Sequence, residues 1–102
     1  MFIARVRGNV VTTQKVAKMT GKKLLLVEPM RVDEAGKSIS PTGRSLVAVD
    51  SIGGGTDDLV LVTQGSSARL TEATSDAPID CVVIGIIDSV SMPAGLIYKK
   101  DR

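Results

Sequence analysis

Residues 2–11 run Phe2-Ile3-Ala4-Arg5-Val6-Arg7-Gly8-Asn9-Val10-Val11. Phe2, Ala4, Val6, Gly8 and Val10 share one face of this stretch, while Arg5, Arg7 and Asn9 lie on the other. Alternation with a period of two predicts a strand with one buried face. Gly8 lies inside this strand, and an interior glycine predicts a bend or bulge of the kind that a tightly coiled barrel needs.

Four further strands are expected along the chain, at residues 24–27, 45–50, 58–63 and 79–92. Pro29 predicts the end of the second strand or a sheet edge, because proline has no N–H to donate. Residues 65–70 start with a glycine and two serines, which predicts one short helix between the fourth and fifth strands. Five strands and one helix predict an all-β domain, a small closed or nearly closed barrel that removes the sheet edges.

Two of these strands carry more apolar surface than a small barrel can cover. Residues 24–27 are apolar on both faces, so we expect one face to meet another subunit. Residues 79–92 would span about 46 Å when extended, so this strand should bend at Gly85 or project beyond the barrel. Alternation places Cys81, Val83 and Ile87 on one face and Val82, Ile84 and Ile86 on the other. One set is expected to fill the barrel, and the other to be covered by a neighbour or by loops.

Composition excludes several classes of function. The 102 residues make one domain and include no histidine, which removes imidazole bases and histidine-ligated metals. The single cysteine excludes an internal disulfide, and one Phe, one Tyr and no Trp leave little for stacking on bases. The longest apolar run is too short to cross a bilayer, and the first residues lack the pattern of a signal peptide. We therefore expect a cytosolic chain with a reduced thiol.

The charge is unevenly distributed along the sequence. Residues 1–31 hold seven Lys/Arg and one acid, whereas residues 32–98 hold three Lys/Arg and nine acids. Three interpretations remain open: a solvated surface on which the charges mix, a molecule with a basic and an acidic side suited to head-to-tail association, and a nucleic-acid-binding surface.

Three loop segments partly match known active-site or ligand-binding motifs, but each lacks residues that its motif requires. Residues 53–56, Gly-Gly-Gly-Thr, are followed by two aspartates instead of the Lys-Ser/Thr of a phosphate-binding loop. Ser66 and Ser67 have no histidine to activate them, and the three aspartates near residues 50–58 lack EF-hand spacing. Cys81 lies in an apolar strand and is expected to be a buried thiol. The sequence therefore favours an assembly component over an enzyme.

Five segments follow one another along the chain: Arg7-Gly8-Asn9-Val10-Val11-Thr12-Thr13-Gln14-Lys15, Gly21-Lys22-Lys23-Leu24-Leu25-Leu26-Val27, and residues 48–55, 59–69 and 78–80. In their order and spacing these segments resemble the CcmL/EutN family of bacterial microcompartment vertex proteins. Together they cover about residues 2–91. The resemblance implies an OB-like five-stranded barrel domain at residues 1–92, a C-terminal tail at 93–102, and a homopentamer that closes a shell of hexameric tiles in the bacterial cytoplasm.

Site assignments follow from this resemblance and from the charge pattern. We expect Gly53, Gly54 and Gly55 to lie close to the fivefold axis or to a neighbouring subunit. The rim that contacts hexameric shell proteins is expected to include Thr13, Gln14, Lys15, Asp76, Pro78 and Asp80. No catalytic residue, cofactor, metal ion, nucleic acid or membrane is expected. The alternative function is an OB-like module that binds single-stranded nucleic acid or a small ligand.

Overall fold

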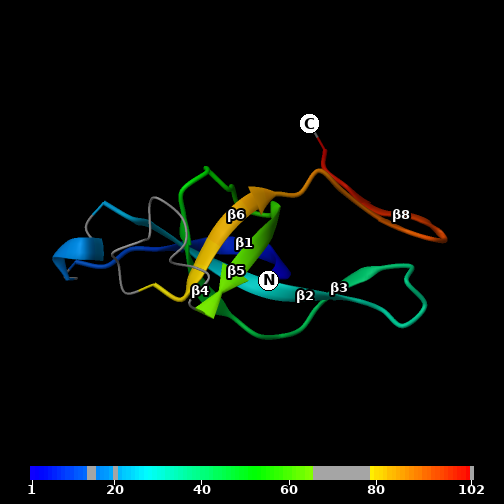
Figure 1. Ribbon diagram of the computed structural model, residues 1–102, viewed down its shortest axis with the longest axis horizontal. Helices are drawn as coiled ribbons and strands as arrows, with labels where there is room; N and C mark the ends of the chain where they lie inside the picture. Colours follow the sequence, from blue (N-terminus) through cyan, green and yellow to red (C-terminus); the bar gives the residue numbers. More distant parts are fainter. Residues whose placement is uncertain (14–15, 20, 66–78, 102) are drawn as a thin grey trace.

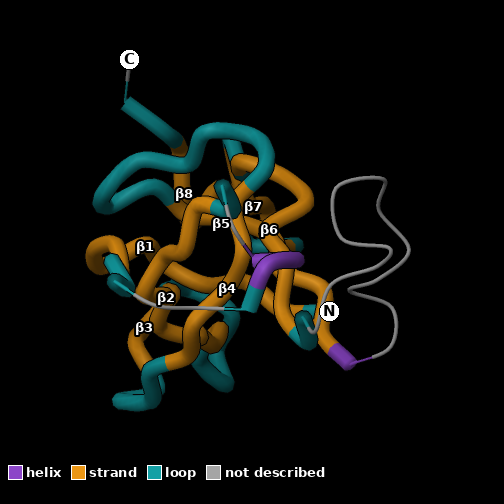
Figure 2. Tube along the Cα trace, turned by 90° about the vertical axis from the view of Figure 1, so that its left-hand side faces the viewer, coloured by secondary structure: helices purple, strands orange, loops and turns teal. Residues whose placement is uncertain are grey.

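The computed structural model describes residues 1–13, 16–19, 21–65 and 79–101. Five strands form a closed barrel: β1 (Phe2–Val10), β2 (Lys23–Val32), β4 (Leu46–Asp50), β5 (Leu59–Gln64) and β6 (Cys81–Ile86). Their order is β1-β5-β6-β4-β2, and the pairing of β1 with β2 closes the sheet on itself (Figure 1). The expected five-stranded barrel is confirmed. Figure 2, viewed from the end that carries the segment after β1, shows the strands around a common centre.

The core of the barrel is built from small, mostly β-branched side chains. Its buried members are Ala4, Val6, Leu25, Val27, Ala48, Val60, Val62, Cys81 and Val83. They come from all five barrel strands, because residues at every second position point inward. Small side chains suit this interior, since a five-stranded barrel encloses little volume. The alternation predicted for β1 is confirmed by its buried residues Ala4 and Val6.

Two irregularities shape the barrel. Val6 of β1 pairs with Val27, and Gly8 pairs with the next residue, Leu26, so Arg7 is an extra residue in β1. This is the bulge that Gly8 predicted. Of the two expected placements of Pro29, the end of the strand is wrong, because β2 continues to Val32. Pro29 lies between the stretch of β2 that pairs with β4, up to Val27, and the stretch that pairs with β3 (Ile39–Pro41) from Met30 onward. A proline fits there because β2 changes its partner at that point.

The last barrel strand departs from simple alternation. Cys81 and Val83 lie in the barrel core, while Val82 packs with Val49 and Ile79 in a second cluster on the outer side. The register with β5 then shifts, since Leu61 pairs with Gly85 and Val62 with Val83. Ile86 therefore packs against the barrel core instead of sharing a face with Val82. Sequence alternation alone placed Ile86 wrongly, because a bulge reverses the faces that follow it.

Two hairpins extend from the barrel at the same end (Figure 1). One joins β2 to β3 through a turn in which Gly36, at φ +67°, donates its N–H to the Asp33 carbonyl over 3.0 Å. The other joins β7 (Ser89–Met92) to β8 (Gly95–Lys99) and forms a separate two-stranded sheet. The expected strand at 79–92 is thus divided into β6 and β7. The boundary expected at residue 92 falls in the turn of this second hairpin.

Helical structure contributes little to the described residues. η1 (Ala17–Met19) is a single turn of 3-10 helix between β1 and β2. The short helix expected at residues 65–70 lies, from residue 66 on, outside the described residues. None of the described segments forms a helix with the length and apolar character needed to span a bilayer.

Candidate subunit interface and rim surfaces

The glycine loop after β4 is organised by one buried carboxylate. Asp50 ends β4, and its side chain is fully buried. Its Oδ1 accepts the backbone N–H groups of Ile52 at 3.0 Å and Gly53 at 3.1 Å, and its Oδ2 accepts that of Gly54 at 2.7 Å. An aspartate followed at two to four residues by free N–H groups commonly forms such a turn. Asp50 therefore fixes the path of the chain through residues 52–54.

The three glycines of this loop have different surroundings. Gly53 has φ +89°, a conformation that side chains disfavour. Gly54 is buried against its own barrel, and a methyl group on it would lie 3.6 Å from Leu25 Cδ1 and from Val60 Cγ1. Gly55 is exposed. The structure thus gives an intramolecular reason for glycine at position 53, where φ is positive, whereas position 54 has room for a methyl group at ordinary contact distance. The expected approach of this loop to a fivefold axis or to a neighbouring subunit remains a prediction, and the exposed Gly55 is the position best suited to test it.

A second set of contacts fixes the far side of the loop. Asp58 Oδ2 accepts the N–H of Gly55 at 2.8 Å. Asp57, at φ +71°, donates its N–H to the Val6 carbonyl over 2.8 Å, and its own carbonyl accepts Arg5 Nη1 at 2.8 Å. The carboxylates of Asp50 and Asp58 are thus used to hold backbone. Among the described residues there is no cluster of metal-ligating side chains.

The cationic groups of β1 are matched within the chain. Arg7 Nε donates to Glu28 Oε1 over 2.8 Å, and Glu28 Oε2 accepts the N–H of Gly43 at 3.0 Å. Arg5 is held by the Asp57 carbonyl and lies with its guanidinium carbon 6.0 Å from the centre of the Tyr98 ring. The basic character of the first strand is therefore partly neutralised on its own surface.

Only part of the expected rim falls within the described structure. Thr13 and Asp80 are exposed, and the segment after β1 and the start of β6 lie at the same end of the molecule, opposite the two hairpins (Figure 1). The Asp80 carbonyl accepts the N–H of Gly65 at 2.7 Å. Gln14, Lys15, Asp76 and Pro78 lie outside the described residues.

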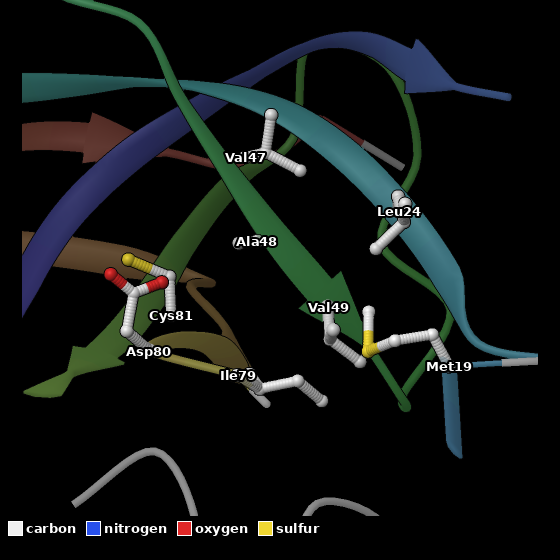
Figure 3. Close-up of a pocket in the computed structure, with 8 residues that line it drawn as sticks. All are labelled: Met19, Leu24, Val47, Ala48, Val49, Ile79, Asp80 and Cys81. Atoms are coloured by element: carbon white, nitrogen blue, oxygen red, sulfur yellow. The ribbon is translucent and has the colours of Figure 1, made fainter. Parts of the chain in front are cut away.

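An apolar groove of about 180 Å³ opens on the outer side of the barrel (Figure 3). Its lining comes from η1, β2, β4 and the start of β6, and comprises Met19, Leu24, Val47, Ala48, Val49, Ile79, Asp80 and Cys81. Val47 is 46% exposed. Burial, and then the negative charge of Asp80, raise the pKa of the Cys81 thiol, so the neutral thiol is favoured, as expected for a buried cysteine.

Sequence reasoning anticipated the surplus of apolar surface but not all of its locations. The expectation of an uncovered face on residues 24–27 agrees with Leu24 lining the groove. The β7–β8 hairpin was missed, although Pro93-Ala94-Gly95 between two apolar stretches was a usable turn signal. The role of Asp50 was also missed, although an aspartate at the start of a loop that contains three glycines is typical of a turn held by a side-chain oxygen.

Comparison with known proteins gives consistent matches. The family model described as ethanolamine utilisation protein EutN/carboxysome matches residues 1–88. The carboxysome shell vertex protein CcmL of Gloeobacter violaceus is 46% identical over 100% of this chain and 98% of its own length. The microcompartment shell vertex protein PduN of Salmonella typhimurium is 49% identical over 89% of this chain and 99% of its own. The structure of GrpN, a pentameric microcompartment shell protein from Rhodospirillum rubrum, superposes with a TM-score of 0.78 at 37% identity, covering 90% of this chain and 99% of GrpN.

Proposed function

The chain belongs to the EutN/CcmL family, and from that premise we propose that it is a structural vertex protein of a bacterial microcompartment shell, working as a cyclic homopentamer and not as an enzyme. The observation that carries the proposal is the match to vertex proteins over the whole chain, with the same barrel as a pentameric shell protein. Flat sheets of hexameric tiles cannot close. Fivefold units at the vertices supply the missing curvature.

The structure fits this role better than the alternative function. Single-stranded nucleic acid is usually bound by exposed aromatic side chains on a barrel face. Here Phe2 packs against the barrel core and Tyr98 lies beside Arg5. Small ligands usually occupy pockets of about 300–1,000 Å³ with a few convergent polar groups. The groove of Figure 3 is smaller and mainly apolar, which suits protein contact.

Contact with hexameric shell proteins forms the second part of the proposal. The candidates are the rim residues Thr13, Gln14, Lys15, Asp76, Pro78 and Asp80. Each polar contact at an exposed rim is worth only about 0–1 kcal/mol, but a pentamer repeats it five times. Two observations support these rim residues: Thr13 and Asp80 are exposed at one end of the molecule, and the segments around them are charged.

The glycine loop is proposed to lie at the fivefold axis or at the contact between subunits. Gly55 provides the test, because among the described residues a Cβ there would come within 4 Å of Asp58 Oδ2 alone, at 3.5 Å. Gly55→Gln should fold but lower the yield of pentamer in native mass spectrometry. Ser51→Gln, at a neighbouring exposed position, is the matched control. An unchanged yield of pentamer for Gly55→Gln removes this loop from the contact.

The vertex function is tested in two stages. Native mass spectrometry at micromolar concentration should give a species of five copies, and a monomer or dimer would contradict the proposal. The matching hexameric shell protein is then expressed with and without this chain and imaged by electron microscopy. Closed particles should need the chain, and tubes or open sheets should form without it. Lys15→Glu should leave the pentamer intact and reduce its incorporation, whereas Lys37→Glu, in the β2–β3 turn, should not.

A further inference from the structure

The connection between β1 and β2 carries two strongly exposed apolar side chains. Val11 is 85% exposed and Val16 is 62% exposed, more than any other valine, leucine or isoleucine that the structure describes. Single exposed apolar residues are common on protein surfaces. Here both belong to the connection that holds the expected rim residue Thr13, at the end of the molecule opposite the two hairpins (Figure 1). This part of the rim therefore lies beside apolar surface that the fold itself leaves uncovered.

Val16 is presented by a turn that is fixed to the barrel. The Met19 N–H donates to the Val16 carbonyl over 2.9 Å, and the Lys22 N–H donates to the Met19 carbonyl over 3.1 Å. The Met19 side chain packs on the second apolar cluster, where it lies beside Val49 (Figure 3). Met19 thus faces the barrel while Val16 stays in solvent. A side chain held in this way needs little further ordering when a partner binds.

The charges near this surface contribute less to a contact than its apolar groups. Lys18 lies in η1 and is exposed, and Lys23 lies 3.7 Å from Asp50 Oδ2, so the charge of Lys23 is matched within the chain. Exposed ion pairs contribute little and are screened by salt. Burial of apolar surface contributes in proportion to the area removed from water. Of the described groups in this connection, Val11 and Val16 therefore offer the larger contribution.

We propose that Val11 and Val16 form the apolar centre of the contact with hexameric shell proteins, and that Met19 is the residue that positions Val16. The partner is the edge of a hexameric tile that presents apolar side chains to the two valines. Lys18 and Asp80 then belong to the polar margin of the contact, as is usual around an apolar interface core. This inference rests on the proposed vertex function, and it assigns the rim an apolar contact in place of paired charges.

Binding of purified pentamers to sheets of the matching hexameric shell protein tests the contact. Bound and free pentamers are separated by sedimentation and measured on gels. Val16→Ser and Val11→Ser should each lower the affinity by about tenfold, the loss expected when one buried valine becomes polar. Val16→Leu keeps the apolar contact and should bind as the wild type does. Val32→Ser, at the end of β2 and at a valine that is 36% exposed, is the matched control and should also bind normally.

Salt separates an apolar contact from a charged one. Raising the salt concentration from about 0.1 M to about 1 M shortens the screening length from about 10 Å to about 3 Å. With sheets that have been cross-linked beforehand, the wild-type pentamer should keep its affinity across this range. A steep fall in affinity assigns the contact to paired charges and overturns the inference.

The positioning role of Met19 needs a different readout. Met19→Ala should weaken binding, and Met19→Leu, which restores the packing on the barrel, should rescue it. In a Val16→Ser background, Met19→Ala should weaken binding no further, because its effect passes through Val16. An equal further loss in that background gives Met19 a general structural role and overturns this part of the proposal.

The possible outcomes separate the inference from the function on which it rests. Circular dichroism and native mass spectrometry first check that each variant has the fold and the ring of the wild type. A Val16→Ser pentamer that binds like the wild type overturns the apolar contact and leaves the vertex function standing. A Val16→Ser chain that folds without forming the ring places Val16 between subunits, which also overturns the inference. A wild-type pentamer that does not bind the sheets at all refutes the contact with hexameric shell proteins itself.

Discussion

Replacing Asp50 by alanine should lower the free energy of unfolding by about 3–5 kcal/mol. The substitution removes the acceptor of three backbone N–H groups, at 2.7–3.1 Å, from a site where the side chain is fully buried. A hydrogen bond to a charged group contributes about 1.5–3 kcal/mol, and a buried donor left without a partner costs about 1–3 kcal/mol. Because Ile52 and Gly53 are exposed, water can accept from part of the backbone that loses its partner. The expected destabilisation is therefore near the lower end of the sum over the three lost hydrogen bonds.

Two further variants separate the hydrogen bonds from the charge. Asp50→Asn keeps one oxygen for Ile52 and Gly53 but turns an amide donor toward the N–H of Gly54, so it should cost about 1–3 kcal/mol. Lys23 lies 3.7 Å from Asp50 Oδ2, and its side chain is 53% exposed. Lys23→Met should therefore cost no more than about 1 kcal/mol, as for other exposed ion pairs.

The measurement is urea unfolding followed by circular dichroism at one fixed protein concentration, since the stability of an oligomer depends on concentration. The expected order of destabilisation is Asp50→Ala, then Asp50→Asn, then Lys23→Met. The reasoning is refuted if Asp50→Ala lies within about 1 kcal/mol of the wild type, or if Lys23→Met costs as much as Asp50→Ala. In the second case the ion pair, and not the backbone turn, would be the source of the stability.

The remaining predictions concern the loops and the thiol. Gly54→Ala should stabilise the chain by about 0.4–1 kcal/mol, because alanine restricts the unfolded chain and its methyl group would meet neighbours at 3.6 Å without a clash. Gly53→Ala should destabilise the chain by about 1–2 kcal/mol, because the backbone there has φ +89°. The midpoints of thermal unfolding of the two variants should therefore move in opposite directions. The N–H of Lys37, and then the other hydrogen bonds from Ser38 and Gly36, lower the pKa of Asp33 below 3.8. The stability that Asp33 contributes should therefore be complete above pH 3.8 and be lost as the pH falls through the lowered value, so unfolding curves of the wild type and Asp33→Asn should differ at pH 7 and converge in acid. Cys81 should react with a thiol reagent such as DTNB only as fast as the protein unfolds, since it is buried with a raised pKa; rapid labelling of the native pentamer would show that β6 opens.

The candidate site was only partly visible in the sequence. The glycine loop could be located from residues 53–55, but the sequence did not reveal that Gly54 is packed against Leu25 and Val60. Such contacts join strands that are far apart in the chain, and no local pattern encodes them. The sequence predicted surplus apolar surface on residues 24–27, of which Leu24 lines the apolar groove, but it did not predict the groove, whose other walls come from η1, β4 and residues 79–81.

The sequence by itself determined the barrel, because alternation is a local property: a strand with one buried face must place apolar side chains at every second residue. It also determined the family, through segments kept in order along the chain. The tertiary structure decided where alternation fails. The bulge at Arg7, the reversal that carries Ile86 into the core, and the change of partner at Pro29 all depend on which strand lies alongside. Pairing between distant strands sets the register, and only the folded chain fixes it.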